Sequence, residues 1–160
     1  MNHISLSDFK WGWIFRHREL PVDSESLLLI RPLDKASANR FWQTQISKEA
    51  THANHFMNDD WPSRKQLWSE RFNWQNSWDA DATALPEELA AHCSWENNVT
   101  VFFAWDVDHV VETRWDVFSR YWKNFLFYDD EPFLLGRGRN QVVRFHSDGT
   151  FQTAVKPAGK

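Results

Sequence analysis

In the first half of the chain, apolar residues recur at helical spacing behind residues that cap helices. Asp23 and Ser24 precede an apolar run that stops before Pro32, which predicts a two-turn helix over 23–30. Asp34 is placed to cap a second predicted helix that runs to about Ile46. The polar stretch 47–60 that follows is interpreted as a loop with helical turns.

The middle of the chain carries two further helix-start signals. The first is Trp61-Pro62 after Asp60, since proline is tolerated in the first turn of a helix, and it predicts a helix over about 62–74. The second predicts a helix from Pro86 to about residue 94, in which Leu89 and Cys93 face the interior. We expect Cys93 to be a small core residue and not a nucleophile.

Four tryptophans in this region have helical spacing but lie in a more polar stretch. Trp61 and Trp68 are seven residues apart, and Trp74 and Trp78 are four apart. Packing against the core is the favoured interpretation of these rings. The alternative is an exposed aromatic binding platform.

The second half of the chain has the pattern of a sheet with one helix. Residues 99–105 are apolar on both faces, which predicts a central strand. Further strands are predicted over 133–135, 141–146 and 150–155, and a short first strand over 12–15. Between the predicted strands 99–105 and 133–135, apolar residues are spaced four, three, four and three positions apart. This spacing predicts an amphipathic helix through Val111, Trp115, Phe118, Trp122 and Phe125.

The turn before the last predicted strand fixes a register. A three-residue loop over 147–149, with Gly149 in the left-handed region, pairs Phe145 with Phe151 and Val143 with Thr153. This register gathers the apolar side chains on one face, so we prefer it to a two-residue loop. The chain is therefore predicted to be a single α+β domain over residues 1–160, with a three- to five-stranded antiparallel sheet and helices packed on it.

The amino-acid composition indicates which side chains fill the core. Eleven of the 160 residues are tryptophan. Each brings a large apolar ring and one N–H donor that needs a partner when buried, so we expect a tryptophan-rich core.

Charge and cysteine usage restrict the classes of function. The net charge of −4 disfavours general binding to nucleic acid. A single cysteine forms no intrachain disulfide, and neither an N-terminal apolar segment nor an apolar run of about 18 residues is present. We therefore expect a cytoplasmic protein that neither enters a membrane nor is secreted. It is expected to be a monomer or a homodimer, since aromatic surface that the core cannot absorb would favour self-association.

Motifs for common chemistries are missing from the sequence. It contains no Gly-rich phosphate loop, nucleophile elbow or paired-cysteine metal motif, so no cofactor is expected. His52, His55 and Asp59 would share one side of a helix and are a weak candidate for a metal site. A solvated loop is the favoured interpretation of this stretch.

A second group of residues is a candidate for binding a ligand or partner. It combines an aromatic ring, an acidic turn and a glycine-flanked loop with two guanidinium groups, which suit carboxylate or phosphate: Trp122, Asp129, Asp130, Arg137 and Arg139. A polar hairpin loop and a solvated acidic turn over 129–131 are the favoured interpretation, and a binding site is the alternative.

Several segments resemble a bacterial family of uncharacterised proteins of this length, known only as a domain of unknown function. The resemblance extends over most of the chain, and the segments that carry it are 13–17, 41–44, 112–118, 121–127 with Asp129-Asp130, and 141–145 with Asp148-Gly149. The resemblance implies one domain and brings no catalytic residue. The aromatic and double-aspartate run followed by two strands is also loosely similar to small bacterial proteins that neutralise toxins.

Two hypotheses about function follow. The first is a non-enzymatic domain that binds a protein partner, with an immunity-like role as one form of it. The alternative is a small-ligand or metal-dependent enzyme that uses scattered aspartates and histidines. The missing catalytic motifs favour the first.

Overall fold

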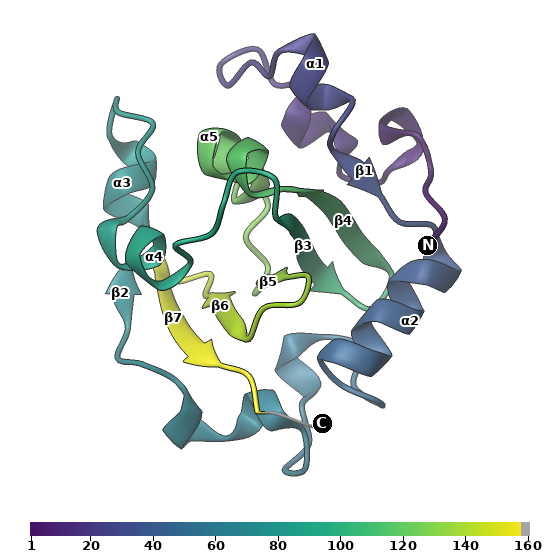
Figure 1. Ribbon diagram of the computed structural model, residues 1–160, viewed down its shortest axis with the longest axis vertical. Helices are drawn as coiled ribbons and strands as arrows, with labels where there is room; N and C mark the ends of the chain where they lie inside the picture. Colours follow the sequence, from purple (N-terminus) through teal and green to yellow (C-terminus); the bar gives the residue numbers. More distant parts are fainter. Residues whose placement is uncertain (158–160) are drawn as a thin grey trace.

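A computed structural model of the chain, which describes residues 1–157, shows one antiparallel sheet with helices on both faces (Figure 1). The sheet has seven strands in the order β1-β4-β3-β5-β6-β7-β2. Their bounds are β1 Arg31–Pro32, β2 Phe72–Asn73, β3 Thr100–Asp106, β4 His109–Arg114, β5 Phe133–Gly136, β6 Gln141–Phe145 and β7 Thr150–Val155. The α+β prediction is confirmed, with more strands than the three to five expected.

Five α-helices accompany the sheet in the described residues. They are α1 Ser24–Leu27, α2 Lys35–Gln45, α3 Gln75–Asp79, α4 Glu87–His92 and α5 Trp115–Phe125. The side chains of Asp23 and Asp34 accept hydrogen bonds from the Ser26 and Ser37 N–H groups, so both cap helices as predicted. The first helix is shorter than predicted.

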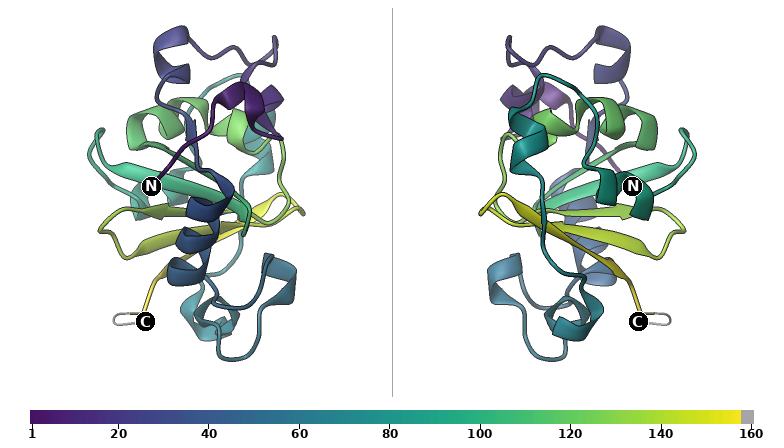
Figure 2. Two further views of the ribbon diagram at one scale, coloured as in Figure 1. Left: turned by 90° about the vertical axis from the view of Figure 1, so that its right-hand side faces the viewer. Right: turned by 90° about the vertical axis from the view of Figure 1, so that its left-hand side faces the viewer.

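Alternate residues of the central strands enter two separate cores. Val101, Phe103 and Trp105 of β3 point to the face covered by α5, whereas Phe102 and Ala104 point to the face of α2 and the segment 46–71. Figure 2 shows α5 and the 50–70 segment on opposite sides of the sheet. The chain is therefore a three-layer domain, and apolar residues on both faces of β3 confirm its central position.

Three predicted elements were wrong. The predicted strand at Gly12–Phe15 is a 3₁₀ turn. The predicted helix over 62–74 is two 3₁₀ turns, Trp61–Ser63 and Lys65–Leu67, followed by β2. Val111 belongs to β4 and not to the helix that begins at Trp115, because a four-residue step is as compatible with a strand end followed by a helix start as with one continuous helix.

The predicted register of the last hairpin is confirmed. Val143 pairs with Thr153 and Phe145 with Phe151, and Gly149 has a φ of 88°. Glycine adopts this left-handed conformation without steric cost, so the turn keeps both phenylalanines on the α5 face.

Most tryptophans are tied to the backbone through their indole N–H groups. Within residues 1–157, eight indoles donate a hydrogen bond, and seven of the acceptors are backbone carbonyls: Ala50 for Trp42, Gln45 for Trp61, Pro62 for Trp68, His146 for Trp74, Lys123 for Trp78, Tyr128 for Trp105 and Thr83 for Trp122. The eighth, Trp95, donates to the side chain of Gln141. Five of the seven carbonyls, all except those of Gln45 and Lys123, lie outside α-helices and strands.

The four tryptophans of the polar middle region belong to the core. Trp61 and Trp74 are buried, and Trp68 and Trp78 are half-buried. Core packing is therefore the correct interpretation of these rings, although it is not achieved through the single helix face that their spacing suggested. Cys93 is fully buried beside Leu89, and burial raises the pKa of its thiol to about 12.

A pair of substitutions separates the indole hydrogen bond from the ring. We expect Trp42→Phe to cost about 1–3 kcal/mol more unfolding free energy than Trp115→Phe. Both rings are buried, but of the two only the Trp42 indole N–H has a hydrogen-bond partner within residues 1–157. Loss of this N–H leaves the buried Ala50 carbonyl unpaired. Urea unfolding of both variants measures the difference, and equal costs would contradict the structural role given to these bonds.

Candidate functional site

A basic pocket lies beside the loop between β5 and β6. Its volume is about 480 Å³, and its lining combines cations with apolar side chains: Met1, Phe41, Gln45, Phe102, Leu135, Gly136, Arg137, Gly138, Arg139, Asn140, Lys156 and Pro157. No acidic residue is among them. The basic pocket is therefore positive in a chain whose net charge is −4.

Two glycines shape the loop that carries the arginines. Gly136 packs so closely on Trp95 that an added Cβ would lie 2.9 Å from its ring. Gly138 has a φ of 68°, the left-handed conformation that turns the loop. Trp95 in turn donates to Gln141 at the start of β6. The loop is thus held by β-sheet pairing on one side and by an indole on the other.

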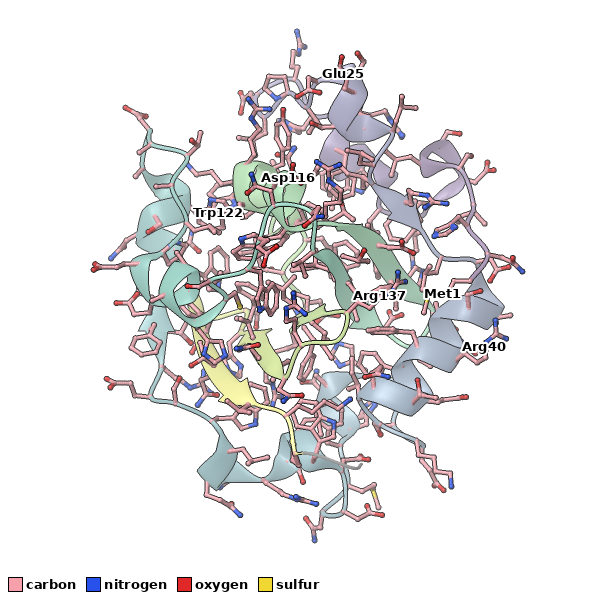
Figure 3. The ribbon with its side chains drawn as sticks, viewed as in Figure 1. Met1, Glu25, Arg40, Asp116, Trp122 and Arg137 are labelled. Atoms are coloured by element: carbon pink, nitrogen blue, oxygen red, sulfur yellow. The ribbon has the colours of Figure 1, made fainter. Side chains whose placement is uncertain are left out.

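The three cations of the basic pocket form no ion pair within residues 1–157. The Arg137 guanidinium lies over the Phe102 ring, 5.2 Å from its centre. The Lys156 ammonium donates to the neutral Gln45 side chain at 2.6 Å, and burial lowers its pKa. A half-buried ammonium with a neutral partner favours the arrival of an anion. Figure 3 shows Arg137 close to Met1, beside α2.

The structure separates the sequence candidates. Trp122 is fully buried on α5 and donates to the Thr83 carbonyl, so it stabilises the core and contributes no binding surface. Asp129 and Asp130 lie in the loop before β5, whereas Arg137 and Arg139 follow it. The four residues of β5, roughly 13 Å long, keep the two groups apart.

The structure does not bring the three residues of the candidate metal site together. His52 lies 3.1 Å from the Asp130 carboxylate, and the centre of its ring is 6.2 Å from that of His55. A 3₁₀ turn over Ala53–His55 replaces the helix that would have aligned them with Asp59. In the part of the chain that is described, no three His, Cys, Asp or Glu side chains converge on a possible metal position.

A charged network that the sequence did not reveal occupies the other end of the β5–β6 hairpin. Glu131 accepts hydrogen bonds from His146 Nδ1 at 3.1 Å and from the Ser147 N–H at 2.8 Å. Among residues 1–157 it is the one non-glycine residue with a positive φ, 55°. Such a conformation costs free energy and is retained only where surrounding contacts impose it.

Burial and the neighbouring polar groups act in opposite directions on the pKa of Glu131. Burial alone would raise the pKa of Glu131, but the hydrogen bonds from His146 and Ser147 and the charges of His146 and Arg144 lower it to about 2. His146 has its other ring nitrogen 2.9 Å from the Gln152 oxygen, while Gln152 donates to the Ser69 carbonyl. Both imidazole nitrogens are therefore engaged, which leaves none available as a general base. The predicted solvated turn over 129–131 is wrong for Glu131, because no sequence pattern indicates that this side chain faces inward.

Comparison with known proteins identifies a family for the chain but no specific function. A family model described as a protein of unknown function, DUF2947, matches residues 3–154. The chain belongs to this family. The predicted resemblance to an uncharacterised family is thereby confirmed, whereas the looser similarity to toxin-neutralising proteins stays a prediction. Neither the curated proteins nor the solved structures contained a match. Among the described helices, none has the length and apolar character needed to cross a membrane.

Two neighbouring carboxylates have pKa values that move in opposite directions, and this gives a test. Because the pKa of Glu131 is lowered from 4.5 to about 2, its contribution to stability is present above pH 4.5 and is lost as the pH falls towards 2. Burial first, and then the charges of Asp130 and Glu131, raise the pKa of Asp129. We expect Glu131→Gln to lower the unfolding free energy at pH 7 and to make this free energy fall less steeply as the pH is lowered. We expect Asp129→Asn to raise the unfolding free energy at pH 7.

The measurement is urea unfolding of both variants between pH 2 and pH 7, the range set by these shifts. Parallel profiles for Glu131→Gln and the unsubstituted protein would contradict the buried network.

Proposed function

We propose that this protein is a non-enzymatic binding domain that receives an acidic segment of a protein partner in its basic pocket. The observation that carries the proposal is the set of three cations, Arg137, Arg139 and Lys156, around an apolar floor with no acidic residue in the lining. Carboxylates pair with guanidinium groups through two parallel hydrogen bonds, and the exposed arginines of the loop are accessible for this.

The floor of the pocket favours a peptide over a bare anion. Phe41, Phe102 and Leu135 belong to the α2 face and line the same pocket. An acidic side chain flanked by an apolar one would bring charge to the arginines and bury apolar surface on this floor. An immunity-like role, in which the partner is a toxin, is one form of this function.

The enzymatic alternative has less support. His52, His55 and Asp59 do not converge within the described residues. Cys93 is buried with a pKa of about 12, and the ring nitrogens of His146 are both occupied. Cys93 and His146 are therefore held in structural roles.

Charge reversal in the pocket tests the proposal. We expect a one-to-one complex to be recovered by affinity purification from the native cell with the unsubstituted protein, and to be lost with Arg137→Glu/Arg139→Glu, because like charges would then face the acidic segment. The matched control is Arg18→Glu/Lys35→Glu, which makes the same change in net charge at two exposed residues outside the pocket.

The control is expected to retain the partner. Recovery of no partner by the unsubstituted protein, or equal recovery by the pocket variant, would overturn the proposal. Circular dichroism of both double variants verifies that each remains folded.

A further inference from the structure

The charged network at the far end of the β5–β6 hairpin opens into a cavity of its own. The cavity measures about 420 Å³ and lies between the segment 62–71 and the hairpin of β6 and β7: Pro62, Ser63, Lys65, Trp68, Arg71, Glu131, Arg144, His146 and Gln152 line it. It shares no lining residue with the basic pocket. We call it the Arg144 cavity.

In the described part of the chain, Arg144 is held in this cavity by two aromatic rings and not by side-chain hydrogen bonds. Its guanidinium lies 5.5 Å from the centre of the Phe56 ring and 5.6 Å from that of Phe133. Its side chain is only 17% exposed, and its Nε is a buried donor without a hydrogen-bond partner among residues 1–157. The closest carboxylate oxygen, on Glu131, is 3.9 Å away, beyond hydrogen-bond distance. The Glu131 carboxylate is too far away to accept a hydrogen bond from Arg144 Nη2, so the terminal N–H groups of Arg144 remain available to a planar or tetrahedral oxyanion.

The charge around the cavity is positive. Three permanent cations, Lys65, Arg71 and Arg144, line it with one carboxylate, that of Glu131. Both Glu131 oxygens are already engaged, by His146 and by the Ser147 N–H. At the exposed rim, Arg71 forms an ion pair with Asp148 at 3.1 Å. Burial first, and then the charge of Arg71, lower the pKa of Arg144 and so disfavour its charged form. Two like charges facing one cavity are relieved by an anion between them.

We propose that the Arg144 cavity is a binding site for a phosphate group, carried by a phosphate monoester whose organic part lies against Trp68. Arg144 supplies the hydrogen-bonding edge, and Lys65 and Arg71 neutralise the second negative charge. Trp68 is half-buried and stacked on Trp61, with the ring centres 6.0 Å apart, so it forms a fixed wall. The site is independent of the proposed partner-binding function.

Titration with two phosphates tests the site directly. The protein labelled with ¹⁵N is titrated at low ionic strength with inorganic phosphate and with phenyl phosphate, and the arginine Nε–H signals are followed by NMR. We expect the Arg144 signal to shift saturably, with a dissociation constant of about 1 mM or tighter for phenyl phosphate. Benzoate, which carries one charge on the same ring, is expected to bind at least about tenfold more weakly.

Variants at the rim separate this cavity from the rest of the surface. Lys65→Gln/Arg71→Gln lies at the edge of the cavity and leaves the buried network intact, and it is expected to weaken phenyl phosphate binding by about tenfold or more. Arg18→Gln/Lys35→Gln makes the same change in charge elsewhere and is expected to leave the affinity unchanged. Arg137→Gln/Arg139→Gln, in the basic pocket, is also expected to leave it unchanged.

The proposal would be overturned if neither phosphate shifted the Arg144 signal saturably, or if benzoate bound as tightly as phenyl phosphate. Equal weakening of binding by the rim and control variants would also overturn it. Loss of binding in Arg137→Gln/Arg139→Gln alone would assign phosphate to the basic pocket and overturn the proposal for the Arg144 cavity, without testing partner binding.

Discussion

The structure depends on buried indole rings that donate hydrogen bonds to backbone carbonyls. A buried carbonyl outside helix and sheet has no regular partner, and leaving it unpaired costs about 1–3 kcal/mol. Five tryptophans supply a donor to carbonyls outside α-helices and strands. Each also brings a ring large enough to fill the space between an irregular segment and the sheet, so one residue type provides both packing and hydrogen bonding. The long segment 46–71, which has no α-helix or strand, is held in this way by Trp42, Trp61 and Trp68.

This arrangement explains where the two cavities lie. The sheet and its tryptophans fix the β5–β6 hairpin, and irregular segments pack against both of its ends. At one end the glycine loop brings Arg137 and Arg139 beside α2, and at the other the strained Glu131 turns towards His146 and Arg144. Both cavities lie on the α2 face, where Arg144 takes the place that an apolar residue would otherwise fill between Phe56 and Phe133.

Local signals predicted the regular elements well. The caps at Asp23 and Asp34, the central strand and the register set by Gly149 depend on neighbouring residues only, and each is confirmed. The helix predicted over 62–74 rests on the start signal at Trp61-Pro62, and the seven-residue spacing of Trp61 and Trp68 agrees with it. Its rings in fact bond to distant or irregular carbonyls, and spacing contains no information about those partners. β1 and β2, each of two residues, are set by pairing with β4 and β7 and leave no periodicity in the sequence.

The candidate sites show the same limit. Arg137 and Arg139 were found because glycines flank them, a local feature, and the structure gathers them around one pocket. Their separation from Asp129 and Asp130 depends on the direction of β5, and the inward turn of Glu131 depends on His146, fifteen residues away. Neither relation can be predicted from the neighbouring residues alone.

Hydrogen exchange of the indole N–H groups tests the central claim most directly. If the indoles of Trp42, Trp74, Trp105 and Trp122 tie irregular segments to the sheet, their N–H groups exchange only with global unfolding, at the rate of the slowest amides of β3. The Trp13 indole, which is 44% exposed, then exchanges at nearly the rate of a free indole. Fast exchange at the four buried indoles, with the β3 amides still protected, would contradict the account.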